Sequence, residues 1–149
     1  MNKIPLEDEP ELAKSYGIAF AWVNLVEENL KWALLTKSKL TTNVPKVVID
    51  LFDNQTLGQK IAMSEGLLNK KVIGKLRDLN NKRRFIAHGL TGQVYIIDDG
   101  GPLPTSDHTI SHQGNSTPLD KLLADVIFLA KELSDLLSLD YDASMKSKK

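Results

Sequence analysis

Apolar residues in the first quarter of the chain recur four and three positions apart. This seam of apolar positions consists of Tyr16, Phe20, Val23, Leu30 and Leu34. The spacing places them on one face of a helix, and it predicts an amphipathic helix over about 11–36. Glu27 sits in the middle of the seam, where an apolar residue belongs. A carboxylate in that position must be ion-paired, hydrogen-bonded or protonated.

Glu27 therefore needs a basic partner on a neighbouring helix, and Arg83 is the obvious candidate. Two roles are open for such a pair. It is either a structural ion pair that joins two helices, or a functional contact in which Glu27 orients Arg83 or His88. Both interpretations predict the same neighbour for the carboxylate.

Two short helices and one long helix follow in the middle of the chain. Residues 43–52 have an apolar face and a proline in the first turn, which favours a short helix. Thr56 and Gln59 have the spacing of a capping box, which predicts a second short helix to about residue 64. After the break at Glu65 and Gly66, a third helix is expected over 67–88, because apolar residues recur there at helical spacing and Gly89 is a typical helix stop.

The segment before the last helix has strand-like patterns. Residues 93–98 have β propensity, residues 99–102 have turn chemistry, and residues 108–112 alternate, so a small β-hairpin is predicted. Thr117 and Pro118 then resemble a cap and a first helical residue, and apolar residues continue at helical spacing to about Ser138. A last amphipathic helix is expected there.

These elements predict an all-α fold, an antiparallel bundle of four to five helices with the hairpin inserted before the last helix. Residues 11–139 are expected to form a single domain, since a chain of 149 residues is long enough to bury one core. The acidic, proline-containing residues 1–10 are expected to be a flexible leader. The polar residues 140–149 are expected to be a disordered tail.

Composition narrows the class of protein. The chain is 42% hydrophobic and 26% charged, as in ordinary globular proteins. It has no cysteine, which excludes disulfides and thiolate metal sites. No secretory signal is visible and no apolar stretch approaches the length of a transmembrane helix, so a cytoplasmic protein without a membrane role is expected.

The distribution of charge says more than its sum. The net charge is zero, which argues against a generally basic nucleic-acid binder. Basic residues nevertheless gather in one helix, opposed there only by Asp78: Lys70, Lys71, Lys75, Arg77, Lys82, Arg83 and Arg84. The run is either a solvated helix face or a local surface that attracts phosphate.

The end of this helix carries the most informative residues. Position 83 should continue the apolar stripe of the helix, but it holds an arginine, and His88 follows five residues later. Asn80, Arg84 and His88 share one face, because residues four apart are neighbours on a helix. From position alone, His88 is a C-terminal histidine that interacts with the helix dipole and the last carbonyls.

The Arg-x4-His pattern of residues 83–88 resembles the motif of the HEPN superfamily, small all-α domains of prokaryotic defence and toxin–antitoxin systems. The preceding helix with Trp22 and Glu27 and the turn at 56–59 fit the same pattern. The resemblance implies metal-independent RNA cleavage by Arg83 and His88, a homodimer with two facing motifs, and an antitoxin or nucleotidyltransferase partner. Arg84 departs from the family pattern, which usually has a small polar residue, often Asn, after the motif arginine.

Beyond the resemblance, four residues are candidates for contacts to RNA: Arg84, Asn80, Arg77 and Lys82. No cofactor or metal is expected. His108 and His112 would lie about 13 Å apart on a strand, too far to share one ion. The alternatives to a ribonuclease are a non-catalytic HEPN-like module that binds a protein partner or nucleic acid, for example a transcriptional regulator, and a purely structural helical dimer.

Overall fold

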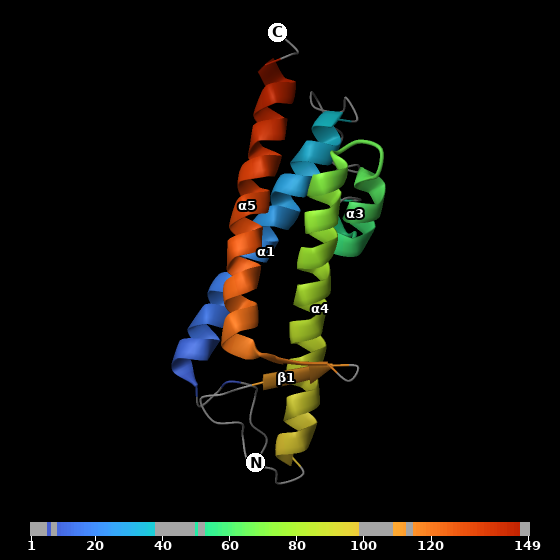
Figure 1. Ribbon diagram of the computed structural model, residues 1–149. Helices are drawn as coiled ribbons and strands as arrows, with labels where there is room; N and C mark the ends of the chain where they lie inside the picture. Colours follow the sequence, from blue (N-terminus) through green and yellow to red (C-terminus); the bar gives the residue numbers. More distant parts are fainter. Residues whose placement is uncertain are drawn as a thin grey trace.

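The structure is a computed structural model that describes residues 6, 9–37, 50, 53–98, 109–112 and 115–146. This part is almost entirely helical, which confirms the expected all-α class (Figure 1). Its helices are α1 (Pro10–Lys37), α3 (Leu57–Ser64), α4 (Lys70–Asp98) and α5 (Leu119–Lys146). A two-stranded ribbon consists of β1 (Thr109–His112) and β2 (Asn115–Pro118).

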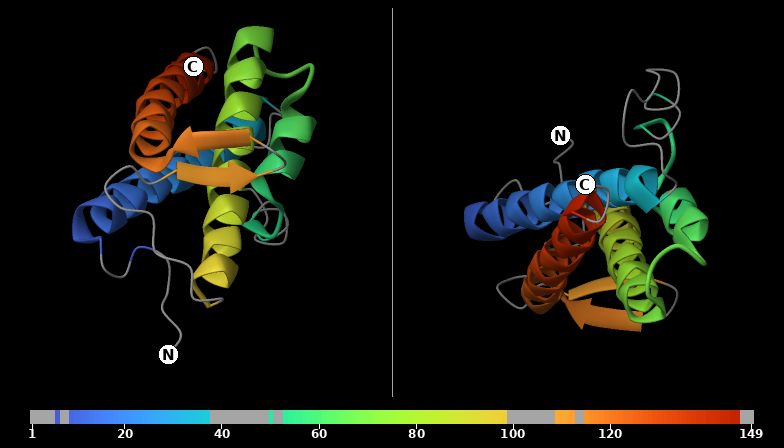
Figure 2. Two further views of the ribbon diagram at one scale, coloured as in Figure 1. Left: turned by 60° about the horizontal axis from the view of Figure 1, so that its bottom comes forward. Right: turned by 90° about the horizontal axis from the view of Figure 1, so that it is seen from above.

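The core lies where α1 and α5 pack together, with α4 against α5 and the short α3 against both α1 and α4. Helix α4 runs antiparallel to α5, and α1 crosses obliquely behind the two (Figures 1 and 2). The largest buried side chains are almost all leucines: Leu30, Leu34, Leu35, Leu57, Leu76, Leu79, Ile86, Leu119, Leu123, Leu133 and Leu137. Leu30 and Leu34 belong to the predicted seam of α1, whose positions share one helix face, whereas Leu35 and Leu57 lie outside it.

The first half of the chain follows its local sequence signals. Helix α1 has nearly the predicted bounds. The capping box of α3 is formed, since the Gln59 backbone N–H donates to Thr56 Oγ1 over 3.1 Å and the Thr56 N–H donates to Gln59 Oε1 over 2.8 Å. Gly66 has a φ of +83°, a conformation that favours glycine, and it makes the predicted break before α4.

The predicted end of α4 is wrong. The helix continues through Gly89 to Asp98, so residues 93–98 are helical and do not form the first strand of the predicted hairpin. A glycine ends a helix where its backbone turns left-handed, whereas in a continuing helix it costs only about 1 kcal/mol. β propensity is likewise a weak local preference that context overrides. The predicted pairing of 93–98 with 108–112 is therefore excluded.

Residues 109–112 instead pair with the next segment of the chain. Strands β1 and β2 are antiparallel, with Ile110 opposite Thr117. The ribbon packs against α4 through β1 and leads directly into α5 (Figure 2). Thr117 is consequently a strand residue and not a helix cap, and Pro118 precedes the first residue of α5.

The predicted termini need one correction. Helix α5 includes residues 140–146, which were expected to belong to a disordered tail. Of the predicted leader, the structure describes Leu6, Glu9 and Pro10, and Leu6 is buried in the core. The predicted short helix at 43–52 lies outside the described residues except for Asp50. Among the described helices, none combines the length and the apolar character needed to span a membrane.

Candidate functional site on helix α4

Helix α4 has two contrasting sides. Its inner side is buried in the core through Val72, Ile73, Leu76, Leu79 and Ile86. Its outer face consists of five exposed polar residues: Lys70, Arg77, Asn81, Arg84 and His88. They are spaced seven, four, three and four residues apart, which aligns them along one side of the helix.

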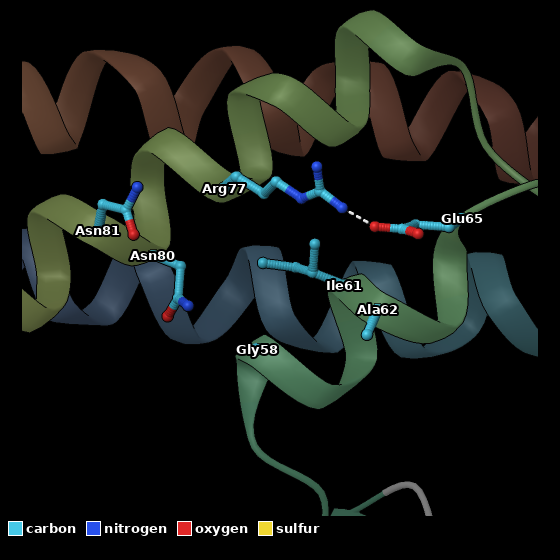
Figure 3. Close-up of a pocket in the computed structure, with 7 residues that line it drawn as sticks. All are labelled: Gly58, Ile61, Ala62, Glu65, Arg77, Asn80 and Asn81. Atoms are coloured by element: carbon cyan, nitrogen blue, oxygen red, sulfur yellow. Dashed lines mark ion pairs between the residues drawn. The ribbon is translucent and has the colours of Figure 1, made fainter.

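A pocket of about 250 Å³ lies between α3 and α4, beside this outer face (Figure 3). Seven residues line this α3/α4 pocket: Gly58, Ile61, Ala62, Glu65, Arg77, Asn80 and Asn81. Arg77 and Glu65 form an ion pair at one side of it. The same pair also borders an adjoining hollow of about 340 Å³ that extends toward Lys70. The two hollows share Glu65 and Arg77 and together follow part of the outer face.

Asn80 is held in a fixed orientation at the pocket. Its Oδ1 accepts a hydrogen bond from Arg83 Nη2 over 3.1 Å. Its Nδ2 lies toward α3, where a β-carbon added to Gly58 would be 3.4 Å away. The absence of a side chain at Gly58 thus allows the close approach of the two helices. Arg83 is half-buried, and its Nε is buried without a hydrogen-bond partner within the described part of the chain.

Arg83 and His88 lie on different sides of α4. Five residues of uninterrupted helix separate them by about 140° around the axis. His88 is exposed, as expected for a group that must reach a substrate, but it is not at the end of its helix as the sequence predicted. The cation that neighbours His88 on the same side, one turn away, is Arg84, which is also exposed.

Glu27 is ion-paired, but with a residue other than the expected one. Lys60 Nζ of α3 donates to Glu27 Oε1 over 2.7 Å. The Lys60 side chain is only 4% exposed and the Glu27 side chain 28%, so the pair is largely buried. The prediction of a partner on α4, and of Arg83 in particular, is wrong. The pair instead joins α1 to α3, the helix that forms one wall of the pocket.

A second buried lysine joins α1 to the segment just before α3, and the sequence interpretation missed it. Lys31 of α1 is ion-paired with Asp53 over 2.8 Å and with Glu28 over 2.9 Å. Burial lowers the pKa of Lys31, but the hydrogen bonds to Asp53 and Glu28 outweigh it and leave the pKa raised above its usual value. The sequence contained a signal for this buried lysine, because position 31 lies one helical turn after Glu27, on the side of the helix that carries the apolar seam.

The four residues predicted to contact RNA lie in three different places in the structure. Arg77 and Asn80 line the pocket, and Arg84 lies farther along the outer face. Lys82 is half-buried and bonded to Asp78 over 3.0 Å, so it is not part of the outer face. The sequence interpretation missed Asn81, Gly58 and Glu65, which enter the pocket only because α3 folds back onto α4.

Metal-ligating side chains do not cluster in the part of the chain that the structure describes. The side chains of His108 and His112 lie outside that part. The outer face offers three cations, one amide and one imidazole as its chemical groups. Such a set binds anions and hydrogen-bonding ligands, and an imidazole can accept or donate a proton.

Comparison with known proteins finds no matching family model, no matching curated protein and no matching solved structure. The function of the site has to be argued from its residues and their geometry.

Proposed function

We propose that this chain is a HEPN-like, metal-independent endoribonuclease that binds RNA along the outer face of α4. The observation that carries the proposal is the alignment of Arg77, Asn81, Arg84 and His88 on one exposed side of one helix. A positively charged surface that follows an extended backbone is how proteins bind single-stranded nucleic acid. Lys70 and Arg84 form no ion pair with any other described residue, so both are available to phosphates.

His88 and Arg84 supply the chemistry in this proposal. The ribose 2′-oxygen attacks the adjacent phosphorus as a base takes the 2′-OH proton, and the bond from phosphorus to the 5′-oxygen breaks as that oxygen gains a proton. His88 acts as the base or the acid. Arg84 stabilises the negative charge that develops on the phosphate oxygens. The products are a 2′,3′-cyclic phosphate and a 5′-hydroxyl.

Arg83 has a different role in one protomer than the motif suggests. Its guanidinium is bonded to Asn80, and position 83 lies about 140° around the helix axis from position 88. We assign it as a positioning residue of the pocket wall. In a dimer of the HEPN type, where two motifs face each other, Arg83 would approach the substrate only across the interface.

A homodimer is part of the proposal, and an exposed apolar stripe on α1 supports it. Ile18, Leu25 and Trp32 are 41%, 42% and 38% exposed and lie seven residues apart, the repeat of a helix that packs against another helix. Leu25→Lys is expected to shift the protein from dimer to monomer in sedimentation at tens of micromolar, because it places a charge in the stripe. A monomer at that concentration without the substitution would contradict the dimer.

One observation favours a second function, a non-catalytic module that binds nucleic acid or a protein partner. The helix continues unbroken past Gly89, so the two motif residues stay on different sides of α4. In this alternative the outer face binds RNA without cutting it.

The test of catalysis compares the protein with its His88→Ala variant on the same RNA in EDTA. The proposal expects cleavage by the unaltered protein and a loss of about 10²–10⁴-fold in the variant, the usual contribution of a general acid or base. The melting temperature should not change, because His88 is exposed. Equal cleavage by both proteins would contradict the assignment of His88, and binding without cleavage would support the non-catalytic module.

A further inference from the structure

We infer that two copies of this chain pair antiparallel through the exposed side of α1, and that the two RNA-binding faces of this dimer lie apart and act separately. The inference rests on the homodimer included in the proposed function, and it adds the interface and the orientation of the two copies. The spacing of exposed residues along α1, their charges and the position of α4 carry it.

Helix α1 has a second heptad-like seam on its exposed side. Six exposed residues recur there at spacings of four and three: Lys14, Ile18, Ala21, Leu25, Glu28 and Trp32. This outer seam lies opposite the buried side of the helix. It contains three of the six large apolar side chains that are exposed in the described part of the chain. A helix in a monomer needs one apolar seam, so a second one indicates another helix as its partner.

The apolar residues of the outer seam complement one another when two copies run antiparallel. If Leu25 of one copy lies level with the partner's Ala21, a large side chain meets a small one, as close packing of helices requires. A two-fold axis repeats this contact on the other side, so one pairing brings both leucines into the interface.

The charged residues of the outer seam favour the same orientation. Lys14 forms no ion pair with any other described residue. In the antiparallel pairing it lies level with the partner's Trp32 and one turn from the partner's Glu28, so opposite charges come together. A parallel pairing would instead place Lys14 beside Lys14 and Glu28 beside Glu28, and like charges at an interface are unfavourable.

The ring of Trp32 is held in place although it is exposed. Its Nε1 donates to Glu28 Oε1 over 3.0 Å, and Lys31 Nζ lies 5.2 Å from the ring centre. A side chain that is already fixed loses little freedom when a partner binds. Tryptophan is also enriched among the residues that contribute most to protein interfaces. Trp32 is therefore suited to the end of the interface beside the partner's Lys14.

This arrangement leaves α4 outside the interface. Helices α4 and α5 lie on the same side of α1, and the outer seam lies on the other side (Figure 2). The two α4 helices are therefore not brought together, in contrast to the facing motifs that the family resemblance implies. Each protomer binds RNA along its own α4, and Arg83 remains a positioning residue.

The first test is disulfide cross-linking, because the chain has no cysteine of its own. Ala21→Cys and Leu25→Cys are oxidised separately and as an equimolar mixture, and the products are identified by mass. The mixture is expected to give the mixed disulfide almost exclusively, since positions 21 and 25 are level across the interface. Within each variant, the two cysteines are offset by about 6 Å along the axis, which exceeds the reach of a disulfide between neighbouring helices.

A change of charge tests the orientation independently. Lys14→Glu is expected to raise the dissociation constant of the dimer about tenfold, because two contacts between opposite charges become contacts between like charges. Lys121→Glu is the matched control, since it makes the same change of charge at an exposed position of α5. It should leave the dissociation constant unchanged. Sedimentation at a series of protein concentrations measures both variants.

The outcomes separate this arrangement from the function on which it rests. Cross-linking of each variant with itself, in preference to the mixed disulfide, would overturn the antiparallel orientation. A dimer in sedimentation that gives no disulfide in any sample would overturn the interface on α1 and leave the homodimer in place. A monomer at tens of micromolar would overturn the homodimer of the proposed function, and would leave the outer seam to a different partner.

The separation of the two RNA sites has its own test. Leu25→Lys, in the His88→Ala background, is expected to bind single-stranded RNA with the same affinity per protomer as the dimer does. Loss of binding in this monomer would overturn the separate sites. Failure of the dimer itself to bind RNA would contradict the proposed function, whereas the cross-linking pattern would still establish the dimer.

Discussion

Basic residues are buried and ion-paired between α1 and α3, whereas on the outer face of α4 they are exposed. Lys60 joins α3 to Glu27 of α1, and Lys31 of α1 is bonded to Asp53 just before α3. The two lysine side chains are only 4% and 7% exposed. On the outer face, Arg84 and Lys70 are exposed and have no ion-pair partner in the described part of the chain. A buried charge without a partner is costly, whereas an exposed one is not. Burial therefore separates charges that hold the fold together from charges available to a ligand.

The largest effect on stability is expected from Glu27→Ala. The substitution leaves Lys60 buried without its carboxylate, and breaking a buried pair in this way typically costs about 3–5 kcal/mol. Glu27 is 28% exposed, so we expect a value at or below the lower end of that range. The free energy of unfolding in urea measures it.

The double variant Glu27→Leu with Lys60→Met is the control for this prediction. It removes both charges and should recover most of the lost stability, since apolar residues of similar volume often replace a buried pair without cost. If Glu27→Ala is as stable as the unaltered protein, the buried pair does not stabilise the fold. That result would contradict the distinction between buried structural charges and exposed charges.

A smaller effect is expected from alkaline titration of Lys31. Its pKa is raised in the folded protein, so its contribution is fully present below the unfolded value of 10.5 and is lost as the pH rises through the folded value. The free energy of unfolding should therefore fall above about pH 10.5 more steeply in the unaltered protein than in Lys31→Met. Parallel curves for the two proteins would contradict the raised pKa.

The sequence predicted the parts of the molecule that depend on local signals. The seam of α1 and the capping box at Thr56 involve residues within a few positions of one another, and both are formed. The end of α4 was predicted wrongly at Gly89, because a glycine permits a helix to end without requiring it.

The site was only partly predictable. The motif helix and the exposure of His88 follow from the sequence pattern, but the pocket requires α3 to lie against α4. Glu27 and its partner Lys60 are distant in the chain, so no periodicity links them. One signal was present nonetheless: Lys60 lies within the stripe of Leu57, Ile61 and Ser64, all of which are buried. A lysine on such a stripe needs a carboxylate just as Glu27 needs a cation.

The most direct test of the outer face compares Arg84→Ala with Lys82→Ala. Each variant removes one cation from α4, and the two substituted positions are only two residues apart. The two variants therefore have the same net charge. Arg84 is exposed on the outer face, whereas Lys82 is half-buried and bonded to Asp78. Affinity for single-stranded RNA is measured for both over a series of salt concentrations, in the His88→Ala background.

Arg84→Ala is expected to weaken binding and to lower the slope of log affinity against log salt by about 0.7, the value for one lost phosphate contact on a single strand. Lys82→Ala should leave both the affinity and the slope unchanged. Equal losses in the two variants would mean that RNA responds only to the overall charge of the helix, and would contradict a binding site on the outer face of α4.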